Sequence, residues 1–278
     1  MAKHLFSLPA AGRPILVCLA CTLLGVPIAS ATDAWEPDGD PATVPVYTQP
    51  GHPPQSRDLQ AIGGVADIDW IAIWMRPLRS YEVFLSNQRS ILDIPSLQRM
   101  NSTRTTTLQW SDGIWSGPGF NTSGGNWYLR WEMPANAIGN TLVNWIRIQG
   151  QTYSGANTIY SFVYRDTTLF CPRFNNTSSQ VSVLMLQGVL EGADSCDFHA
   201  HFSNEAGTLL GSQGGTINAD RMVIVINTPN VAGVAGQKGG AQITHTCGYG
   251  NLKAKMVALE PENGRTAADR RRCAHSGK

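Results

Sequence analysis

Charged residues are scarce in this 278-residue sequence. Asp, Glu, Lys and Arg make up only 15% of it, and the formal net charge is +1. Typical globular domains contain about 25% charged residues. Nucleic-acid binding needs a concentrated basic surface, and the one basic cluster here is a run of three arginines, Arg270 to Arg272, which we interpret as solvated. We therefore expect no nucleic-acid partner.

Recognisable hydrolase motifs are missing as well. The sequence contains no G-x-S-x-G nucleophile elbow, no H-E-x-x-H zinc motif and no catalytic-cysteine signature. A catalytic triad would have to use one of the five histidines that follow the N-terminal segment: His52, His199, His201, His245 and His275. We predict that the protein is not an enzyme and has no catalytic residues.

Apolar runs long enough to matter for a membrane are confined to the N-terminus. Basic residues at positions 3, 4 and 13 precede an apolar run over residues 15–28, and Ala29-Ser-Ala31 follows. This order is typical of a signal peptide cleaved after Ala31. Gly25 and Pro27 interrupt the run, which is too short to span a bilayer comfortably, although a retained anchor or a lipoprotein modified at Cys21 are the alternatives. We expect a periplasmic or secreted protein with no membrane span in its mature chain.

Four cysteines remain after such a cleavage, and export makes disulfides their expected state. No C-x-x-C pair survives to favour zinc, and four cysteines allow three pairings. Alternation along a strand places Cys196 on the same face as Phe198, and Cys247 on the same face as Ile243. A Cys196–Cys247 disulfide is therefore plausible, with Cys171 as a rival partner and Cys273 left to pair with the remaining cysteine.

Short strand candidates separated by Gly-rich turns predict an all-β fold. Residues 32–60 contain six prolines and are typical of an extended linker or a loosely docked N-terminal arm. Strand patterns follow at about ten-residue spacing, without a convincing helix. We expect two β-sandwich domains, over residues 61–165 and 166–262, followed by a basic C-terminal tail, residues 263–278. The strand candidates are residues 68–74, 81–85, 105–110, 127–131, 142–148, 158–164, 181–187, 196–202, 208–212, 222–227, 242–246 and 253–259.

The first half resembles bacterial pre-peptidase C-terminal domains. It contains a D-x-D-W strand start at residues 67–70, an R-x-Y-x-V return at residues 79–83, and an aromatic closing strand at residues 160–164. Its Pro77-Leu78 turn and Trp-rich middle depart from that family. The resemblance implies a jelly-roll-like sandwich that accompanies other secreted domains and has no catalytic residues of its own.

The second half resembles a module of uncharacterised secreted bacterial proteins. Matching segments are residues 166–174, 207–210, 231–236, 245–250 and 255–261. The resemblance implies an immunoglobulin-like or similar sandwich, and it says almost nothing about activity, because function depends on sites rather than folds.

Two pairs of side chains are candidate metal ligands. His199 and His201 share one face of a strand, where a transition metal would need a third ligand, and exposed surface histidines are the simpler interpretation. Asp67 and Asp69 lie on one side of a strand start and could take calcium together with backbone oxygens. We therefore expect no cofactor, with calcium as the alternative.

Tryptophan is unevenly distributed, because all eight residues lie between Trp35 and Trp145. Aromatic rings bury large areas, so we expect four of the tryptophans to be core residues: Trp70, Trp74, Trp131 and Trp145. Three others lie near Gly-rich turns and are candidates for stacking against a sugar: Trp110, Trp115 and Trp127.

These observations favour a non-catalytic structural or interaction module that is accessory to a larger surface or secreted system. Its partner would be an unknown protein or a polysaccharide. The alternative is a carbohydrate-binding protein that uses the turn-adjacent tryptophans of its first domain, and an enzyme with an unrecognised site is a third hypothesis.

Overall fold

The computed structural model describes residues 39–42, 48–59, 67–87, 96–111, 126–149, 159–190, 195–260 and 265–275. The predicted signal peptide lies outside these residues. The described segments form β-strands and two short 3-10 helices, Gly139–Leu142 and Thr228–Asn230, and they contain no α-helix. No helix among them could cross a bilayer. The prediction of an all-β fold is confirmed.

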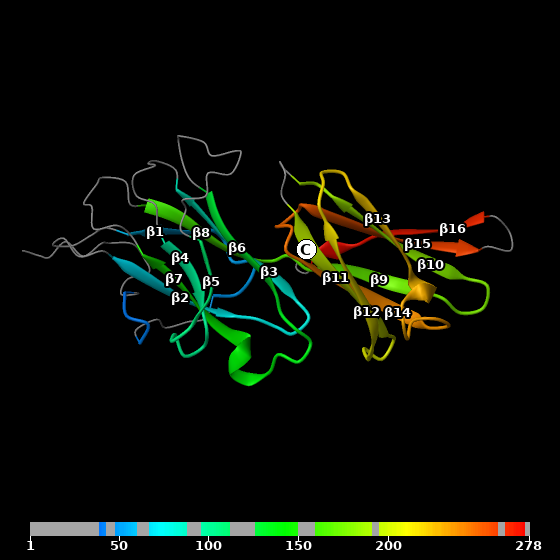
Figure 1. Ribbon diagram of the computed structural model, residues 1–278, viewed down its shortest axis with the longest axis horizontal. Coiled ribbons are helices and arrows are strands. Elements are labelled where there is room, and N and C mark those ends of the chain that lie inside the picture. Colours follow the sequence, from blue (N-terminus) through cyan, green and yellow to red (C-terminus); the bar gives the residue numbers. More distant parts are fainter. Residues whose placement is uncertain are drawn as a thin grey trace, which may run out of the picture. The chain divides into compact units, whose positions relative to one another are not determined.

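The first eight strands form a β-sandwich, which we call the first sandwich (Figure 1). Sheet 1 has the strand order β1-β8-β3-β6, and sheet 2 has the order β2-β7-β4-β5. The strands are β1 (Gln55–Asp58), β2 (Ile68–Trp74), β3 (Ser80–Asn87), β4 (Ser96–Met100), β5 (Thr107–Ser111), β6 (Asn126–Glu132), β7 (Val143–Gln149) and β8 (Ile159–Asp166).

The pairing of these strands is that of a jelly roll. Strand β1 pairs with β8, β2 with β7, β3 with β6, and β4 with β5, all antiparallel. Such nested pairs arise when one long double-stranded ribbon wraps around a core. The expectation of a jelly-roll-like sandwich in this half is therefore confirmed.

The core of the first sandwich is rich in aromatic side chains. Trp131, Tyr81 and Tyr164 stack with ring centroids 5.5–6.3 Å apart. The Arg99 guanidinium lies 4.7 Å from the centroid of the Trp131 ring, and burial lowers the pKa of Arg99 to about 10. The Tyr164 hydroxyl, at the polar end of its ring, donates to the Trp74 carbonyl. Inward-facing aliphatic residues of both sheets complete the cluster.

Nine further strands form the second sandwich (Figure 1). Sheet 3 has the order β13-β10-β15-β16, and sheet 4 has the order β12-β11-β14-β9-β17. The strands are β9 (Leu169–Asn175), β10 (Val181–Gly188), β11 (Cys196–Asn204), β12 (Leu209–Ile217), β13 (Val223–Asn227), β14 (Lys238–His245), β15 (Leu252–Glu260), β16 (Arg265–Arg272) and β17 (Ala274–His275).

The second sandwich repeats the pairing of the first. Strand β9 pairs with β14, β10 with β13, and β11 with β12, while β15 pairs with β16. Strand β16 therefore occupies the position that β1 holds in the first sandwich, although it comes from the C-terminal end. This arrangement agrees with the expected all-β sandwich class. Its strand order differs from the A-B-E-D and C-F-G sheets of immunoglobulin domains, because β9 lies beside β14 rather than β10.

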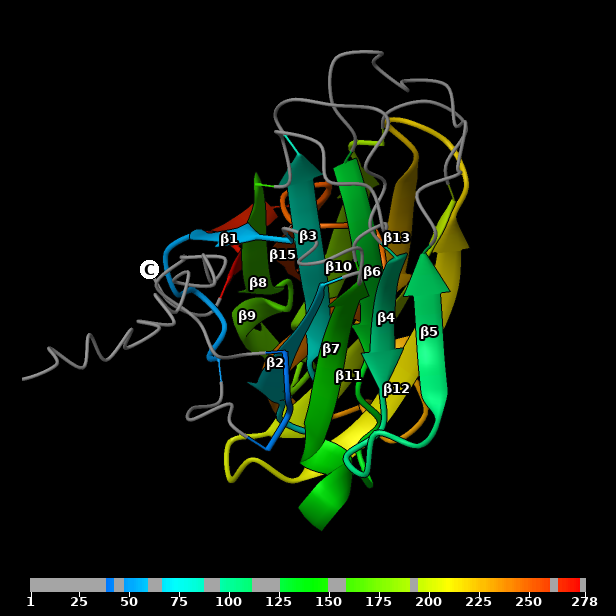
Figure 2. The same ribbon diagram turned by 90° about the vertical axis from the view of Figure 1, so that its left-hand side faces the viewer.

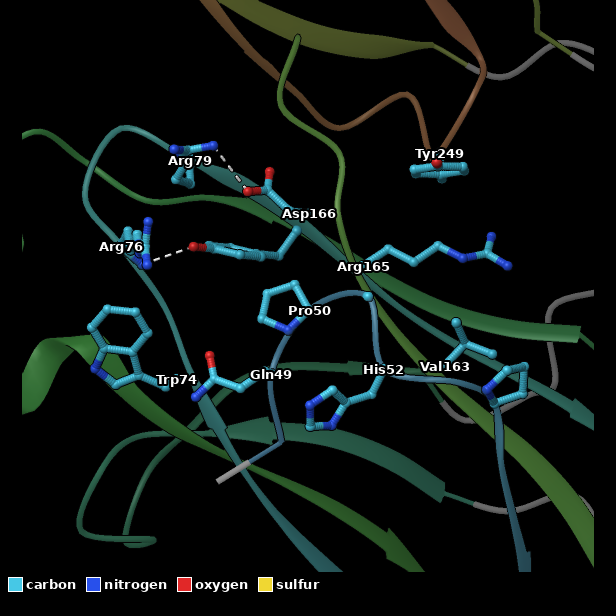
Figure 3. Close-up of a pocket in the computed structure, with 13 residues that line it drawn as sticks. Gln49, Pro50, His52, Trp74, Arg76, Arg79, Val163, Arg165, Asp166 and Tyr249 are labelled. Atoms are coloured by element: carbon cyan, nitrogen blue, oxygen red, sulfur yellow. Dashed lines mark hydrogen bonds and ion pairs between the residues drawn. The ribbon is translucent and has the colours of Figure 1, made fainter. Parts of the chain in front are cut away.

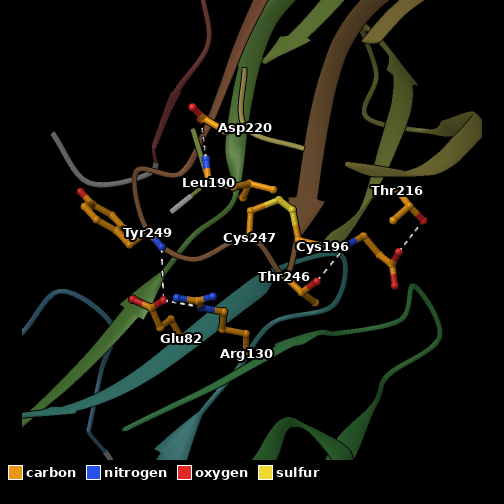
Figure 4. Close-up of a disulfide and its surroundings, with 10 residues drawn as sticks. Glu82, Arg130, Leu190, Cys196, Thr216, Asp220, Thr246, Cys247 and Tyr249 are labelled. Carbon is orange, nitrogen blue, oxygen red and sulfur yellow. Dashed lines mark hydrogen bonds and ion pairs between the residues drawn. A yellow bond between two sulfur atoms is a disulfide. The ribbon is translucent and has the colours of Figure 1, made fainter. Parts of the chain in front are cut away.

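Two disulfides tie the second sandwich together, Cys196–Cys247 and Cys171–Cys273. Cys196 and Phe198 face inward on β11 while Asp197 and His199 face outward, as strand alternation predicted. The expected Cys196–Cys247 pairing is confirmed, and Cys273 takes the remaining cysteine. Figure 4 shows the Cys196–Cys247 disulfide with Thr246 beside it. The Thr246 hydroxyl accepts a hydrogen bond from the Asp197 backbone N–H at 3.0 Å.

Both ends of the sequence contribute strands that the sequence pattern did not predict. The segment interpreted as a linker contains β1, and the segment interpreted as a basic tail contains β16 and β17. Strand β1 is polar, yet Gln55 and Arg57 are buried because the Arg57 guanidinium donates to the Gln55 side chain at 2.8 and 3.1 Å. Backbone pairing with β8 holds this strand at the edge of sheet 1.

A two-residue connection joins the sandwiches, because β8 ends at Asp166 and β9 begins at Leu169. The intervening threonines are buried: the Ser80 N–H donates to the Thr168 hydroxyl at 2.9 Å, and the Thr167 and Ser80 hydroxyls lie 2.8 Å apart. Both sandwiches fall within one compact unit, Ala31–Lys278. The junction is therefore packed rather than an exposed linker.

Candidate functional site

The outward side of sheet 2 carries large aromatic side chains together with polar ones. Alternation along β2 sends Ile71 and Ile73 into the core and leaves Trp70 and Trp74 on the outer side, half-buried. Figure 2 looks onto this sheet, with β2, β7, β4 and β5 side by side in that order. The outer side of this sheet is the candidate site.

Strand register brings four outward side chains into one row across the sheet. Trp70 on β2 is the cross-strand partner of Arg147 on β7, Arg147 is the partner of Gln98 on β4, and Gln98 is the partner of Trp110 on β5. Three strand spacings separate the two indoles, a distance of about 14 Å. We call these four residues the tryptophan row.

Contacts along the tryptophan row order its polar centre. The Arg147 guanidinium donates to the Gln98 side-chain oxygen at 3.4 Å, and its Cζ lies 5.8 Å from the Trp70 ring centroid. Partial burial lowers the pKa of Arg147, because desolvation disfavours the charged form. The row therefore places hydrogen-bonding groups between two rings.

Trp110, at one end of the row, is exposed, with 63% of its surface accessible. Its neighbour Gln109 faces the opposite way, and the Gln109 side chain donates to the Arg130 carbonyl of sheet 1 at 3.0 Å. This bond fixes the orientation of β5. An exposed indole on an anchored strand is available for stacking, because its own fold does not need it.

Trp70 contacts Trp145 of the neighbouring strand on the outer side of sheet 2. The two rings meet edge to face with centroids 6.3 Å apart. The Trp145 indole N–H donates to the Ser102 carbonyl at 3.2 Å, and the Arg104 guanidinium lies 5.1 Å from the Trp145 ring centroid. Trp145 is therefore a supporting residue, and Trp70 is the ring that it orients.

The geometry of the tryptophan row suits a ligand with both apolar and hydroxyl-rich surfaces. Indole rings offer flat apolar faces with polar edges. The guanidinium of Arg147 and the amide of Gln98 offer donors and an acceptor between them. A sugar ring has C–H groups on its faces and hydroxyls around its edge, so a chain of sugars matches both kinds of group.

The structure places several tryptophans differently from the expected division into core residues and ligand candidates. Trp131 is buried, as expected. Trp127 is a correction: it is only 4% exposed and belongs to the core, because it shares the inward face of β6 with Leu129 and Trp131. Trp115 lies outside the described residues. Trp70, Trp74 and Trp145, expected in the core, are half-buried on the outer side of sheet 2.

The sequence held a partial signal for this site. Strand β7 alternates strictly, with Asn144, Ile146 and Ile148 inward, which places Trp145 and Arg147 together on the outer side. Strand β2 has no such signal, because apolar residues occupy both of its faces. The cross-strand row itself depends on register between strands far apart in sequence.

The paired aspartates at the start of β2 do not form an open calcium site. Asp69 is only 1% exposed, faces the core and accepts a hydrogen bond from the Tyr160 hydroxyl. The Asp67 carboxylate accepts from the Ile68 backbone N–H at 2.9 Å. Within the described part of the chain, no three His, Cys, Asp or Glu side chains cluster as metal ligands. These carboxylates serve the strand start and the core.

The His199 and His201 rings lie side by side with centroids 6.1 Å apart, but each has another partner. The His199 ring bonds to the Glu132 carboxylate at 2.7 Å, and the His201 ring lies 3.3 Å from the Thr244 hydroxyl. Burial lowers the pKa of His201 to about 4 and raises the pKa of Glu132, an increase that His199 opposes. The pair belongs to this polar network, and the described residues supply no third metal ligand.

Comparisons with known proteins add little to this geometry. No family model matches the sequence, and no curated protein matches it. Among solved structures, a β-glucuronidase from glycoside hydrolase family 2 is similar at 8% sequence identity, over 74% of this chain, with a TM-score of 0.19. The chain spans 23% of the length of that enzyme. A likeness this weak carries no argument about fold or activity.

Proposed function

We propose that this protein is an exported, non-catalytic accessory module that binds a polysaccharide on the outer side of sheet 2. The tryptophan row is the observation that carries the proposal. Trp70 and Trp110 flank Arg147 and Gln98 across four strands, so a sugar chain lying across the strands meets rings at both ends and hydrogen-bonding groups between them.

The length of the row favours a chain over a single sugar. A span of about 14 Å exceeds the width of one pyranose ring, so the two indoles would stack on different sugar units. Each contact alone would be weak, and simultaneous contacts supply the affinity. This argument selects a polysaccharide or long oligosaccharide rather than a monosaccharide.

Other observations support export and the absence of catalysis. Two disulfides are expected in an oxidising compartment, which agrees with the signal peptide proposed for residues 1–31. The sequence has no recognisable hydrolase motif. The jelly-roll pairing of the first sandwich is what the resemblance to pre-peptidase C-terminal domains implies, and such domains accompany other secreted domains.

Affinity electrophoresis through gels containing soluble β-glucan, xylan or amylose tests the proposal. At least one of these polysaccharides should retard the wild-type protein. Trp110→Ala and Trp70→Ala should each weaken that binding about tenfold, which corresponds to about 1.4 kcal/mol. The Trp110 variant is the sharper probe, because its exposed side chain contributes little to stability.

Tyr128→Ala is the matched control, because Tyr128 is also exposed, at 41%, but lies on sheet 1. It should leave the retardation unchanged. If all three variants bind equally, the tryptophan row is not the binding site. If no polysaccharide retards the wild-type protein, the ligand class is wrong.

A further inference from the structure

A cavity of about 670 Å³ lies beside the edge of the first sandwich, and no residue of the tryptophan row lines it (Figure 3). Residues 49–54 form one wall of it, because the Thr48 backbone N–H donates to the Ala72 carbonyl of β2 at 2.7 Å and directs the following residues along the sheet edge. The volume falls within the range of roughly 300–1,000 Å³ that is typical of small-molecule sites.

The charged side chains that line this cavity are unbalanced. Three arginines, Arg76, Arg79 and Arg165, face a single carboxylate, Asp166. Arg79 pairs with Asp166 at 3.1 Å, and Arg165 lies 3.7 Å from the Glu82 carboxylate. Arg76 has no carboxylate within ion-pair distance among the described residues. The lining therefore keeps an excess positive charge.

Each guanidinium in the lining lies over an aromatic ring. The ring centroids of Trp74, Phe170 and Tyr249 lie 5.3, 4.3 and 5.0 Å from the Cζ atoms of Arg76, Arg79 and Arg165 respectively. Stacking covers the face of a guanidinium but leaves the N–H donors at its edge. These arginines are thus held in position with donors still available.

The position of Arg76 is fixed at its backbone as well. Its N–H donates to the Tyr81 hydroxyl at 2.7 Å, and burial raises the pKa of Tyr81 to about 12, so that hydroxyl stays protonated at neutral pH. Figure 3 shows Arg76 and Trp74 on one side of the cavity and Arg165 and Tyr249 on the other. Positive charge and aromatic surface therefore face the cavity together.

We propose that this cavity binds a small organic anion, a ring-bearing carboxylate, with its carboxylate on Arg76 and its ring against Trp74 and Val163. The planar fork of an arginine matches a carboxylate. The apolar part of the lining, which includes Pro50, Pro54 and Val163, matches a ring rather than a bare inorganic ion. This proposal does not depend on polysaccharide binding by the tryptophan row.

Isothermal titration calorimetry of the full-length protein with 2-naphthoate tests the proposal. Its neutral analogue 2-naphthamide and inorganic phosphate are the comparison probes. We expect saturable binding of 2-naphthoate, with at least tenfold weaker binding of the amide and of phosphate. Arg76→Gln should weaken naphthoate binding at least tenfold, and Arg76→Lys should restore part of it.

Arg173→Gln is the matched control, because Arg173 is exposed on β9 and does not line the cavity. It should bind naphthoate as the wild type does. Equal binding of the amide would show that the carboxylate is not recognised, and equal binding of phosphate would show that the ring is not. An unchanged affinity in Arg76→Gln would also overturn the proposal. Trp110→Ala should leave naphthoate binding intact, which separates this site from the tryptophan row.

Discussion

The two sandwiches share one strand pairing but hold it together by different means. Each has four antiparallel pairs in two facing sheets. In the first sandwich, the edge position beside β8 is filled by β1, which precedes the other strands. In the second sandwich, the equivalent position beside β15 is filled by β16, which follows β9 to β15 in the sequence. The same edge position is therefore filled by an N-terminal strand in one sandwich and by a C-terminal strand in the other.

Their cores differ more than their topologies. The first core is built around the stacked rings of Trp131, Tyr81 and Tyr164, and all its described strands lack cysteine. The second core contains two cystines and the edge-to-face pair Phe174–Phe202, and no tryptophan follows Trp145. Large rings bury more area per residue, whereas disulfides act mainly by restricting the unfolded chain.

This difference makes the two sandwiches separately observable. Every tryptophan precedes β8 in the sequence, so indole fluorescence carries no signal from a residue of the second sandwich. Amide hydrogen exchange of peptides from β9–β17 reports the second. A change confined to one sandwich should therefore leave the signal of the other unchanged.

Loss of the disulfides should have the largest effect, and it should fall on the second sandwich. Loop entropy assigns about 4.7 kcal/mol to the Cys171–Cys273 bond and about 4 kcal/mol to the Cys196–Cys247 bond, since they enclose 102 and 51 residues. Urea unfolding with and without dithiothreitol measures this. On reduction, exchange protection of β9–β17 should be lost at lower urea, while the indole transition stays in place.

Paired Cys→Ser substitutions are the control for a general effect of the reductant. Removing Cys171 and Cys273 together should cost slightly more stability than removing Cys196 and Cys247. If indole fluorescence shifts in parallel with the exchange of the second sandwich, the buried junction at Thr167 and Thr168 couples the two into a single cooperative unit.

The sequence predicted the second sandwich better than the site, and particular residues show why. Strand β11 alternates without exception from Cys196 to Phe202, so the inward cysteine was visible from the pattern. Strand β6 carries the same signal, because Trp127, Leu129 and Trp131 are two residues apart, and that period predicts a core position for Trp127. The proximity of Trp127 to a Gly-rich turn is a weaker indicator of a ligand-binding position.

Strands β1 and β16 and the cross-strand register of the tryptophan row have no signal in the local sequence pattern. Strand β1 is a polar tetrapeptide in a proline-rich segment, and the side chains it buries are Gln55 and Arg57. Strand β16 contains four arginines, so its composition resembles a solvated tail. Both strands form because a neighbouring strand offers unpaired backbone groups, which only the three-dimensional arrangement reveals. The tryptophan row depends on register in the same way.

Truncation of a core ring should have the next largest effect, and it should fall on the first sandwich. Trp131→Ala removes a ring that contacts Tyr81, Tyr164 and the Arg99 guanidinium. We expect a loss of about 4 kcal/mol from the first sandwich, within the range for large-to-small core changes. The fluorescence-detected urea midpoint should fall, with exchange of β9–β17 unchanged. Trp110→Ala is the matched control, and a comparable loss there would show that Trp110 is a core residue.

Mild acid should have the smallest of these effects, and it should again fall on the second sandwich. Burial lowers the pKa of His245 on β14 from 6.5 to about 3. Between these values the unfolded chain binds a proton that the folded chain excludes, so stability is complete above pH 6.5 and decreases as the pH falls towards 3. At pH 5 the loss of stability is about 2 kcal/mol, since one pKa unit corresponds to about 1.4 kcal/mol.

His201 acts in the same direction, because burial lowers its pKa to about 4. Hydrogen exchange of β9–β17 at pH 7 and pH 5 measures the loss, and His245→Gln should reduce the pH dependence. An equal dependence in His245→Gln would assign the acid sensitivity to other groups.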